Sequence, residues 1–353
     1  MLEFLDTAID YISGLNTLPW IIVGFILTIV FSKLLGEERL NKIMKQNTLI
    51  LLFIFVPLLL FRILLNVNIG LNELLFTVAC FIIISLMYML AYFYANYKSN
   101  KIGLKEEKKW NYIKTVLTNQ GRSSAFVGGM MLIIPEWQVQ VIIYMIVGAL
   151  FLFAIIPLIL SILHKKEMKS SKSDEEIKAL PWYLKIFPLY LFGFALTAII
   201  LNLFTGVNTQ EPTDFNRFFN YFTQITIPAA LYFVGAGIHP KDLKIDEIKK
   251  LFSIKAKIKD HWLWIRNIFY LTVIITPFLT IAFILPVFYL GLIPSAWFAV
   301  IIINSFLPIT STNMFLIAYG IDKKVTALSV TWTTIICVPI VVFLIAVFSI
   351  YFL

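Results

Sequence analysis

The chain has 353 residues, of which 60% are hydrophobic and only 14% are charged. Ordinary soluble domains are about half apolar and about a quarter charged, so this composition excludes that class and predicts a helical membrane protein. The formal net charge of +9 does not indicate nucleic-acid binding, because most of the basic residues lie in the loops between long apolar runs.

Apolar runs of about 20 residues, the length that crosses the hydrocarbon core as a helix, recur ten times along the chain. We therefore expect an all-α polytopic membrane protein with ten transmembrane helices. The expected spans are residues 17–35, 47–65, 74–96, 112–133, 139–163, 183–204, 218–238, 266–288, 294–318 and 326–352.

Lysine and arginine are unevenly distributed among the loops between these runs. Odd-numbered loops are rich in them, whereas even-numbered loops hold almost none apart from Arg217. Because basic loops stay on the cytoplasmic side, we expect a multi-pass protein of the cell membrane with its odd-numbered loops in the cytoplasm and both termini outside. The lipid bilayer is then an expected partner, and nucleic acid is not.

Short motifs recur in the two halves of the chain. LPWIIVGFILT (Leu18 to Thr28) and FPLYLFGFALT (Phe187 to Thr197) share the pattern P-x4-G-F-x-L-T. Prolines also stand at matching places in spans two and seven and in spans five and ten: Pro57, Pro228, Pro157 and Pro339. Five helices cross the membrane an odd number of times, so a second copy enters from the opposite side. This pattern predicts an inverted 5+5 repeat, a plan that many secondary transporters share.

The two repeats are expected at residues 1–163 and 182–353. Residues 164–181, which include the polar stretch KKEMKSSKSDEEIKAL, are expected to form a cytoplasmic linker between them.

Polar residues interrupt spans four and nine. Span four contains TNQGRSS (Thr118 to Ser124), and span nine contains Asn304 and then PITSTN (Pro308 to Asn313). In hydrocarbon, every backbone amide and carbonyl needs a partner, and hydroxyl and amide side chains beside a Gly or Pro supply partners for an unwound stretch. Ser123, Ser124, Thr310 and Ser311 are candidates to cap restarting half-helices. Two such N-termini, facing each other near the midplane, would favour an anion.

Arg122 is the sharpest single candidate, because a charge near the middle of a membrane is costly and marks a functional site by default. It could clamp a carboxylate through two hydrogen bonds. Alternatively, it could neutralise the carbonyl ends of the broken helices, or lie shallower and extend its head to the interface.

Other chemistry is not indicated by the sequence. No Asp or Glu is expected well inside a span, so a carboxylate that binds a coupling ion is not expected either, and a cation/proton antiporter is disfavoured. The three histidines (His164, His239 and His261) are expected at solvated surfaces, and Cys80 and Cys337 in apolar segments. No metal-ligand spacing, HExxH or GxSxG-type motif is present. We therefore expect neither an enzyme nor a bound metal or cofactor.

The segments around the two interruptions resemble the auxin efflux carrier family, which includes plant PIN exporters and bacterial or archaeal malate and malonate permeases. The resemblance is carried by TNQGRSSAFVG (Thr118 to Gly128) and FLPITSTNMFLIAYGID (Phe306 to Asp322), and it extends to FVPLLLF, IPAALYFVGAGI and TWTTIICVPI. It implies a fold like that of the bile-acid symporters, with crossed, broken helices 4 and 9. Helices 1, 2, 6 and 7 would form a scaffold that often dimerises, and helices 3–5 and 8–10 would carry substrate by an elevator motion.

The resemblance also assigns individual residues. Asn119 matches the asparagine of the family's first crossover, and Pro308 matches the proline of the second. Gln120 stands where the plant exporters have proline, and Arg122 stands where they have an uncharged residue. These departures favour a more anionic substrate than auxin, such as a dicarboxylate.

Together these observations predict a secondary carrier of a small organic anion, driven by the membrane potential and the anion gradient. Two alternatives stay open: a sodium-coupled symporter of the same fold, and a non-transporting sensor that binds a lipid or sterol. The expected substrate-binding residues are Asn119, Gln120, Arg122, Ser123, Asn304, Pro308, Thr310, Ser311 and Asn313.

Overall fold

A computed structural model shows how these segments fold. It describes residues 17–66, 70–123, 134–170, 182–207, 213–226, 228–229, 232, 236, 261–310, 313, 316–317, 319–320 and 321–352. The described part of the chain is helical, and its only β-type pairing is one isolated bridge. The protein is thus all-α, as the sequence predicts.

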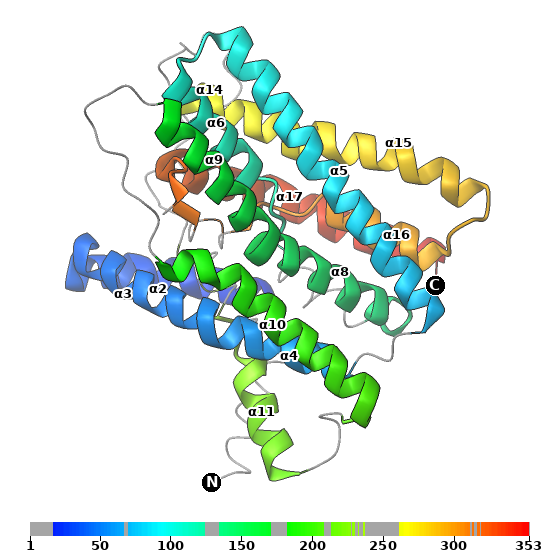
Figure 1. Ribbon diagram of the computed structural model, residues 1–353. Coiled ribbons are helices and arrows are strands. Elements are labelled where there is room, and N and C mark those ends of the chain that lie inside the picture. The colour runs from blue at the N-terminus through cyan, green and yellow to red at the C-terminus, as the bar shows by residue number, and fades with distance from the viewer. Residues whose placement is uncertain are drawn as a thin grey trace.

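The helices form two groups that lie side by side (Figure 1). In the first group, α4 packs against α10 and α11, and α2 packs against α3. Its members are α2 (Thr17–Leu35), α3 (Glu37–Ile50), the π-helix η1 (Leu51–Phe55), α4 (Val56–Asn66), α10 (Trp182–Thr205) and α11 (Asp214–Gln224).

The second group contains the longer helices and both of the interrupted segments. Its members are α5 (Leu71–Ile102), α6 (Glu106–Thr118), the 3₁₀-helix η2 (Pro135–Trp137), α8 (Gln138–Leu150), the π-helix η3 (Phe151–Ile155), α9 (Ile156–Ser170), α14 (His261–Phe269), the π-helix η5 (Tyr270–Ile275), α15 (Thr276–Tyr289), α16 (Ser295–Ser305) and α17 (Lys323–Phe352). The two groups meet where α10 contacts η3 and α9.

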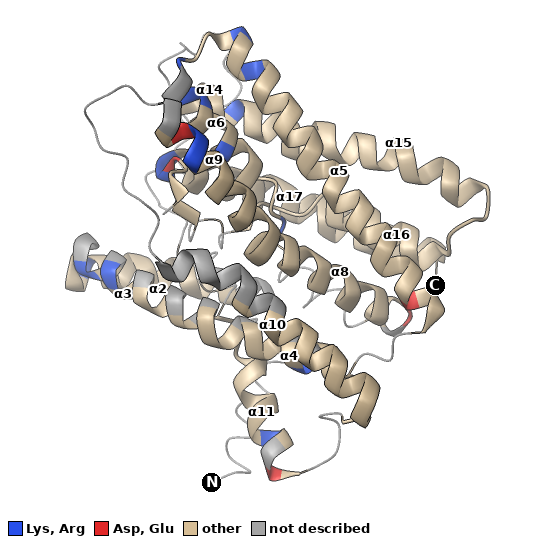
Figure 2. Ribbon diagram, viewed as in Figure 1, with Lys and Arg blue, Asp and Glu red and all other residues tan. Residues whose placement is uncertain are grey.

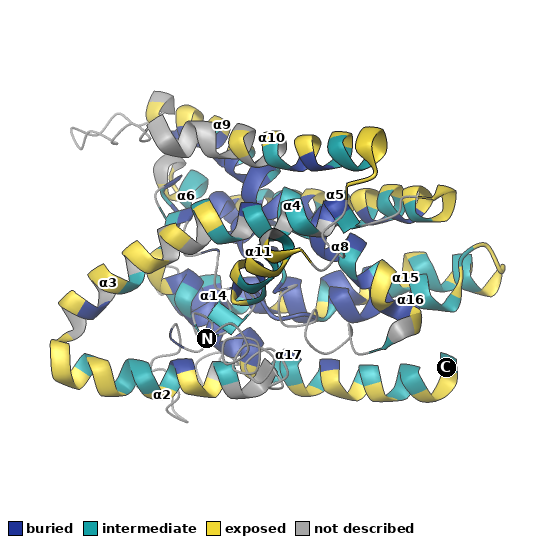
Figure 3. Cartoon of the chain, turned by 90° about the horizontal axis from the view of Figure 1, so that it is seen from below, coloured by how far each residue is buried: buried dark blue, intermediate teal, exposed yellow. Residues whose placement is uncertain are grey.

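Four described helical stretches are long and apolar enough to cross a membrane: Leu71–Ile102, Gln138–Met168, His261–Tyr289 and Lys323–Phe352. Shorter apolar helices are found at Ile22–Leu35, Phe53–Asn66, Gly193–Thr205 and Ser295–Ser305. Large apolar side chains are exposed along these helices, and Figure 3 shows exposed positions along several of them. Such a surface is stable in lipid rather than in water, so the chain is an all-α membrane protein.

Charged residues are concentrated at helix ends. Lys and Arg gather where α5, α6, α9 and α14 end on the same side of the second group (Figure 2). Long apolar helix interiors therefore separate the charged ends, as the loop pattern of the sequence predicts.

Each of the three π-helices directly precedes a proline-containing helix start. The prolines are Pro57 after η1, Pro157 after η3 and Pro277 after η5. Proline has no N–H to donate and its ring crowds the preceding turn, and one wider turn accommodates that ring without ending the helix. In the π register, residue 277 would donate to the carbonyl of residue 272, so Pro277 leaves the carbonyl of Thr272 free for another donor.

Candidate functional site

The two interrupted segments meet in the structure. Helix α6 ends at Thr118 and α16 ends at Ser305. The residues that follow pair as a short antiparallel bridge between Arg122 and Ile309. The amide of Ser123 donates to the carbonyl of Pro308 at 2.9 Å, and the amide of Thr310 donates to the carbonyl of Gly121 at 2.9 Å. The sequence predicts two breaks, and the structure places them in contact.

This pairing satisfies backbone groups that the broken helices leave open. The amide of Ile309 donates to the hydroxyl of Thr333 on α17 at 3.1 Å, and Pro308 has no amide to satisfy. Gly121 is required by the close approach: a Cβ there would lie 2.7 Å from Oδ1 of Asn313 and 2.9 Å from Cδ1 of Leu152. A side chain at position 121 would therefore force Asn313 and Leu152 to move.

Asn119 and Gln120 are buried at the end of α6. The Nδ2 group of Asn119 donates to the carbonyl of Thr115 at 2.7 Å and to the hydroxyl of Thr326 at 3.3 Å. The Oε1 atom of Gln120 accepts a hydrogen bond from Thr276 at 3.4 Å. In each amide the other polar atom, Oδ1 of Asn119 and Nε2 of Gln120, has no partner among the described residues.

Arg122 is half-buried beside the bridge and bonds two carbonyls. Its guanidinium donates to the carbonyl of Leu307 at 3.1 Å and to that of Thr272 in η5 at 2.9 Å. Leu307 follows the end of α16, and Thr272 has the carbonyl that Pro277 leaves free within a continuous helix, so Arg122 covers one broken helix end and one carbonyl of the π-helical turn. Nε of Arg122 is buried without a partner, and no described carboxylate forms an ion pair with the guanidinium.

The second break contributes Asn304, Pro308, Thr310 and Asn313, all of them buried. The Nδ2 group of Asn304 donates to the carbonyl of Val300 at 2.7 Å, while its Oδ1 has no described partner. Both polar side-chain atoms of Asn313 are buried without a described partner.

The capping residues Ser124 and Ser311 lie outside the described residues. After the second break, Asn313, residues 316–317 and Tyr319 adopt 3₁₀ rather than α-helical conformation. The α-helical N-terminus expected there is therefore absent from the described part of span nine, and Arg122 remains as the strongest positive feature of the crossing.

Several polar residues of the crossing are missed by the sequence reasoning. Thr326, Ser329 and Thr333 recur at helical spacing on α17 and are all buried. Thr326 and Thr333 contact the two breaks directly, and their spacing is the signal that could have identified them. Thr272 has no such signal, because its role depends on the π register of a distant helix.

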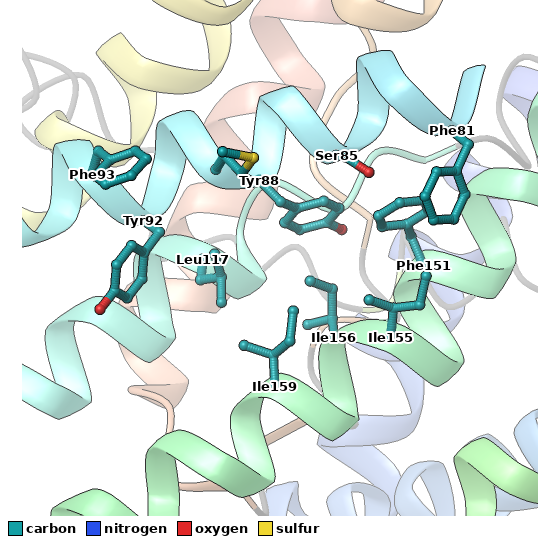
Figure 4. A pocket seen from close by; sticks show the side chains of 11 residues that line it. Phe81, Ser85, Tyr88, Tyr92, Phe93, Leu117, Phe151, Ile155, Ile156 and Ile159 are labelled. Atoms are coloured by element: carbon teal, nitrogen blue, oxygen red, sulfur yellow. The ribbon is translucent and has the colours of Figure 1, made fainter. Parts of the chain in front are cut away.

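An apolar cavity of about 340 Å³ lies next to the crossing, between α5 and the η3–α9 stretch (Figure 4). Tyr88 and Leu117 line it, and Leu117 immediately precedes the polar run of α6. Its only other polar side chains are Ser85 and Tyr92. This cavity can accept hydrocarbon but offers no charge to an anion, so the candidate site for a charged group is the crossing itself.

A second polar cluster lies one turn earlier on α6. Nζ of Lys114 donates to Oε2 of Glu167 at 2.5 Å and to the carbonyl of Tyr319 at 2.7 Å. Nδ1 of His164 lies 3.4 Å from Nζ of Lys114 and 3.4 Å from Oε2 of Glu167.

One prediction is wrong at this cluster. His164 was expected at a solvated surface and is buried, with 5% of its surface exposed. Glu167, expected in the polar linker, is equally buried and lies one residue before the end of the apolar stretch Gln138–Met168. The reason is that α9 continues to Ser170, beyond the expected span end at residue 163 and into the expected linker. The carboxylate therefore stays in the helix and meets Lys114.

No family model matches this chain, and no curated protein matches it.

Proposed function

We propose that this protein is a secondary carrier that moves a small organic anion, a carboxylate or dicarboxylate, across the cell membrane. The proposed architecture is ten spans in an inverted 5+5 repeat, with both termini outside and the broken spans four and nine crossing at the substrate. The resemblance to the auxin efflux carrier family supports the same reading.

One observation carries the proposal: among the described residues, the crossing has a cation without a counter-charge and several side-chain polar atoms without a hydrogen-bond partner. Nε of Arg122, Nε2 of Gln120 and the amide of Asn313 are buried without described partners, and no described carboxylate balances Arg122. An unpaired buried polar group costs about 1–3 kcal/mol. A carboxylate that accepts from these groups would supply both the missing acceptors and the missing negative charge.

The arrangement of the two helix groups supports an elevator-type motion. The described contacts of the crossing come from the second group, from α6, η5, α16 and α17. In the first group, α4 packs against α10 and α11, and α10 also contacts η3 and α9 of the second group. We propose that the first group, spans 1, 2, 6 and 7, is a scaffold that could also form a homodimer. The second group, spans 3–5 and 8–10, would then move with the anion bound.

A sodium-coupled symporter of the same fold is the second candidate. It is favoured by buried oxygens without described partners, Oδ1 of Asn119, Oδ1 of Asn304 and Oγ of Ser329. Oxygen ligands of this kind suit a hard cation.

Flux in proteoliposomes tests the proposal. Labelled malate, malonate and indole acetate are presented with and without a sodium gradient and an imposed membrane potential. Carboxylate flux without sodium supports the anion carrier, and strict sodium dependence supports the symporter. If no anion moves while the protein remains folded in the bilayer, carriage of these anions is wrong and a lipid- or sterol-binding sensor becomes the better reading.

A further inference from the structure

Apart from Arg122 at the crossing, the buried charged side chains of the described residues are gathered in one place. Among the side chains that the structure describes, Lys114, His164 and Glu167 are the only buried Lys, His, Asp or Glu residues. They come from α6 and α9 and meet within hydrogen-bonding distance or close to it. A buried ion pair contributes little net stability compared with apolar residues of the same size, and ionisable groups within membrane helices mark ion or proton pathways by default.

We propose that the Lys114–His164–Glu167 cluster is a proton-binding site that couples proton movement to the flux of the anion. The coupling rests on the proposed function, whereas proton binding by the cluster does not.

The chemistry of the cluster suits reversible protonation. An ammonium, a carboxylate and a neutral imidazole together carry no net charge, and one added proton on His164 or Glu167 makes the cluster cationic. A protonated imidazole would sit 3.4 Å from the ammonium of Lys114 and repel it. A protonated Glu167 would lose its charge attraction for the same ammonium. Either protonation weakens the hold on Lys114. His164 and Glu167 each keep about 6% of their side-chain surface exposed.

Lys114 connects this cluster to both breaks of the crossing. On its own helix it lies one turn before Thr118 and Asn119. Across the interface, Asn111 donates to the carbonyl of Gly320 at 2.9 Å, and the hydroxyl of Thr115 accepts from the amide of Asp322 at 2.9 Å. Together with the bond from Lys114 to Tyr319, three side chains of α6 hold the turn that ends the second broken span.

Gly320 makes this close contact possible. Its φ of +78° lies in the left-handed region that favours glycine. A Cβ there would lie 2.6 Å from Nζ of Lys114. A displacement of Lys114 would therefore change its contacts with Tyr319 and Gly320, which follow the second break.

Several other charged groups near the cluster have partners of their own. Lys109 of α6 donates to Asn100, Lys98 of α5 lies over the ring of Tyr94, and Lys166 of α9 lies over the ring of Trp110. Asp322 accepts from the amide of Val325. Further titratable side chains on the neighbouring elements include Lys101, Lys105, Lys108, Tyr112, Lys165, His261, Arg266, Tyr319, Lys323 and Lys324.

Proton binding is tested without any substrate. Thermal-unfolding midpoints of the protein in nanodiscs are measured between about pH 5.5 and 8.5, the range in which histidine titrates. We expect the wild-type midpoint to shift with pH and the profiles of Glu167→Gln and His164→Gln to flatten. The control is Glu136→Gln, which changes an exposed carboxylate of η2 and should keep the wild-type profile. Wild-type profiles in both cluster variants would overturn the proton site.

Coupling is tested in proteoliposomes that contain the pH dye pyranine. We expect entry of labelled malate to acidify the lumen, and Glu167→Gln to lose this acidification while Glu136→Gln keeps it. Malate flux that moves no protons and is unchanged in Glu167→Gln would overturn the coupling and leave the carrier proposal standing. If no anion moves, the carrier proposal fails, and the unfolding profiles alone decide whether the cluster binds a proton.

Discussion

Two polar clusters lie one turn apart on α6 and are satisfied in opposite ways. At Lys114, the ammonium has a carboxylate and a carbonyl within 2.7 Å. At the crossing, Arg122 bonds only carbonyls, and the neighbouring amides of Gln120 and Asn313 keep buried atoms without described partners. Buried polar groups that stabilise a fold have hydrogen-bond partners within the protein. Buried polar groups that lack such partners can form hydrogen bonds with a ligand. This contrast is what we expect if the crossing binds the proposed anion and the Lys114 cluster positions the chain around it.

The largest effect is expected at the complete cluster. Lys114→Met removes the ammonium that Glu167 and the carbonyl of Tyr319 share, and it leaves a buried carboxylate without its cation. Breaking one side of a buried ion pair costs about 3–5 kcal/mol, so we expect a much lower thermal-unfolding midpoint.

The double variant Lys114→Met, Glu167→Leu is the control, because it removes both charges and keeps the volume. We expect it to regain most of the lost stability. A Lys114→Met protein as stable as the wild type would show that the pair is not buried in the membrane-embedded protein.

The next effect is expected at Arg122 and concerns flux rather than folding. Arg122→Gln can still donate to a carbonyl but has no positive charge for a carboxylate. A hydrogen bond to a charged group contributes about 1.5–3 kcal/mol, so anion flux at low concentration should fall about ten- to a hundredfold. Uptake of labelled malate measures this, with Arg217→Gln, an exposed change on α11, as the control. Unaltered uptake in Arg122→Gln would show that Arg122 binds the carbonyls of Leu307 and Thr272 but does not bind the anion.

A backbone comparison gives a smaller effect. Gly121→Ala places a Cβ within 2.7 Å of Asn313 and 2.9 Å of Leu152, whereas a Cβ at Gly193 of α10 meets nothing within 4 Å. Overpacking of this kind costs about 1–3 kcal/mol. We expect Gly121→Ala to lower both the unfolding midpoint and the flux, and Gly193→Ala to change neither. Equal behaviour of the two variants would argue against the tight crossing of spans four and nine.

Much of this fold is predictable because hydrocarbon imposes a simple rule on the sequence. The run 17–35 coincides with α2, and the run 183–204 lies within α10 (Trp182–Thr205). The breaks are predictable for the same reason: Asn119 and Asn304 interrupt apolar runs at the ends of α6 and α16, where the structure has its non-helical segments.

The missed features depend on partners that are far apart in the sequence. Thr272 looks like an ordinary helical threonine until Pro277 and the π register free its carbonyl for Arg122. Glu167 looks like part of a polar linker because the apolar run stops before it, and only the continuation of α9 brings it to Lys114. Composition locates the membrane segments, but it does not reveal which polar groups find each other.

The last prediction compares two buried or half-buried asparagines, one without a described hydrogen-bond partner and one with a partner. Asn313→Leu replaces an amide whose two polar atoms have no described partner. The substitution therefore removes a buried polar group whose desolvation is not offset by a described hydrogen bond. We expect the free energy of unfolding to stay within about 1 kcal/mol of the wild-type value or to rise, while malate flux falls. Asn202→Leu is the matched control, because Nδ2 of Asn202 donates to the carbonyl of Leu65 at 2.5 Å between α10 and α4. That variant should lose stability without a specific loss of substrate affinity. If Asn313→Leu instead loses stability as Asn202→Leu does, then Asn313 is part of the fold, and the incomplete polar set at the crossing is smaller than the anion site requires.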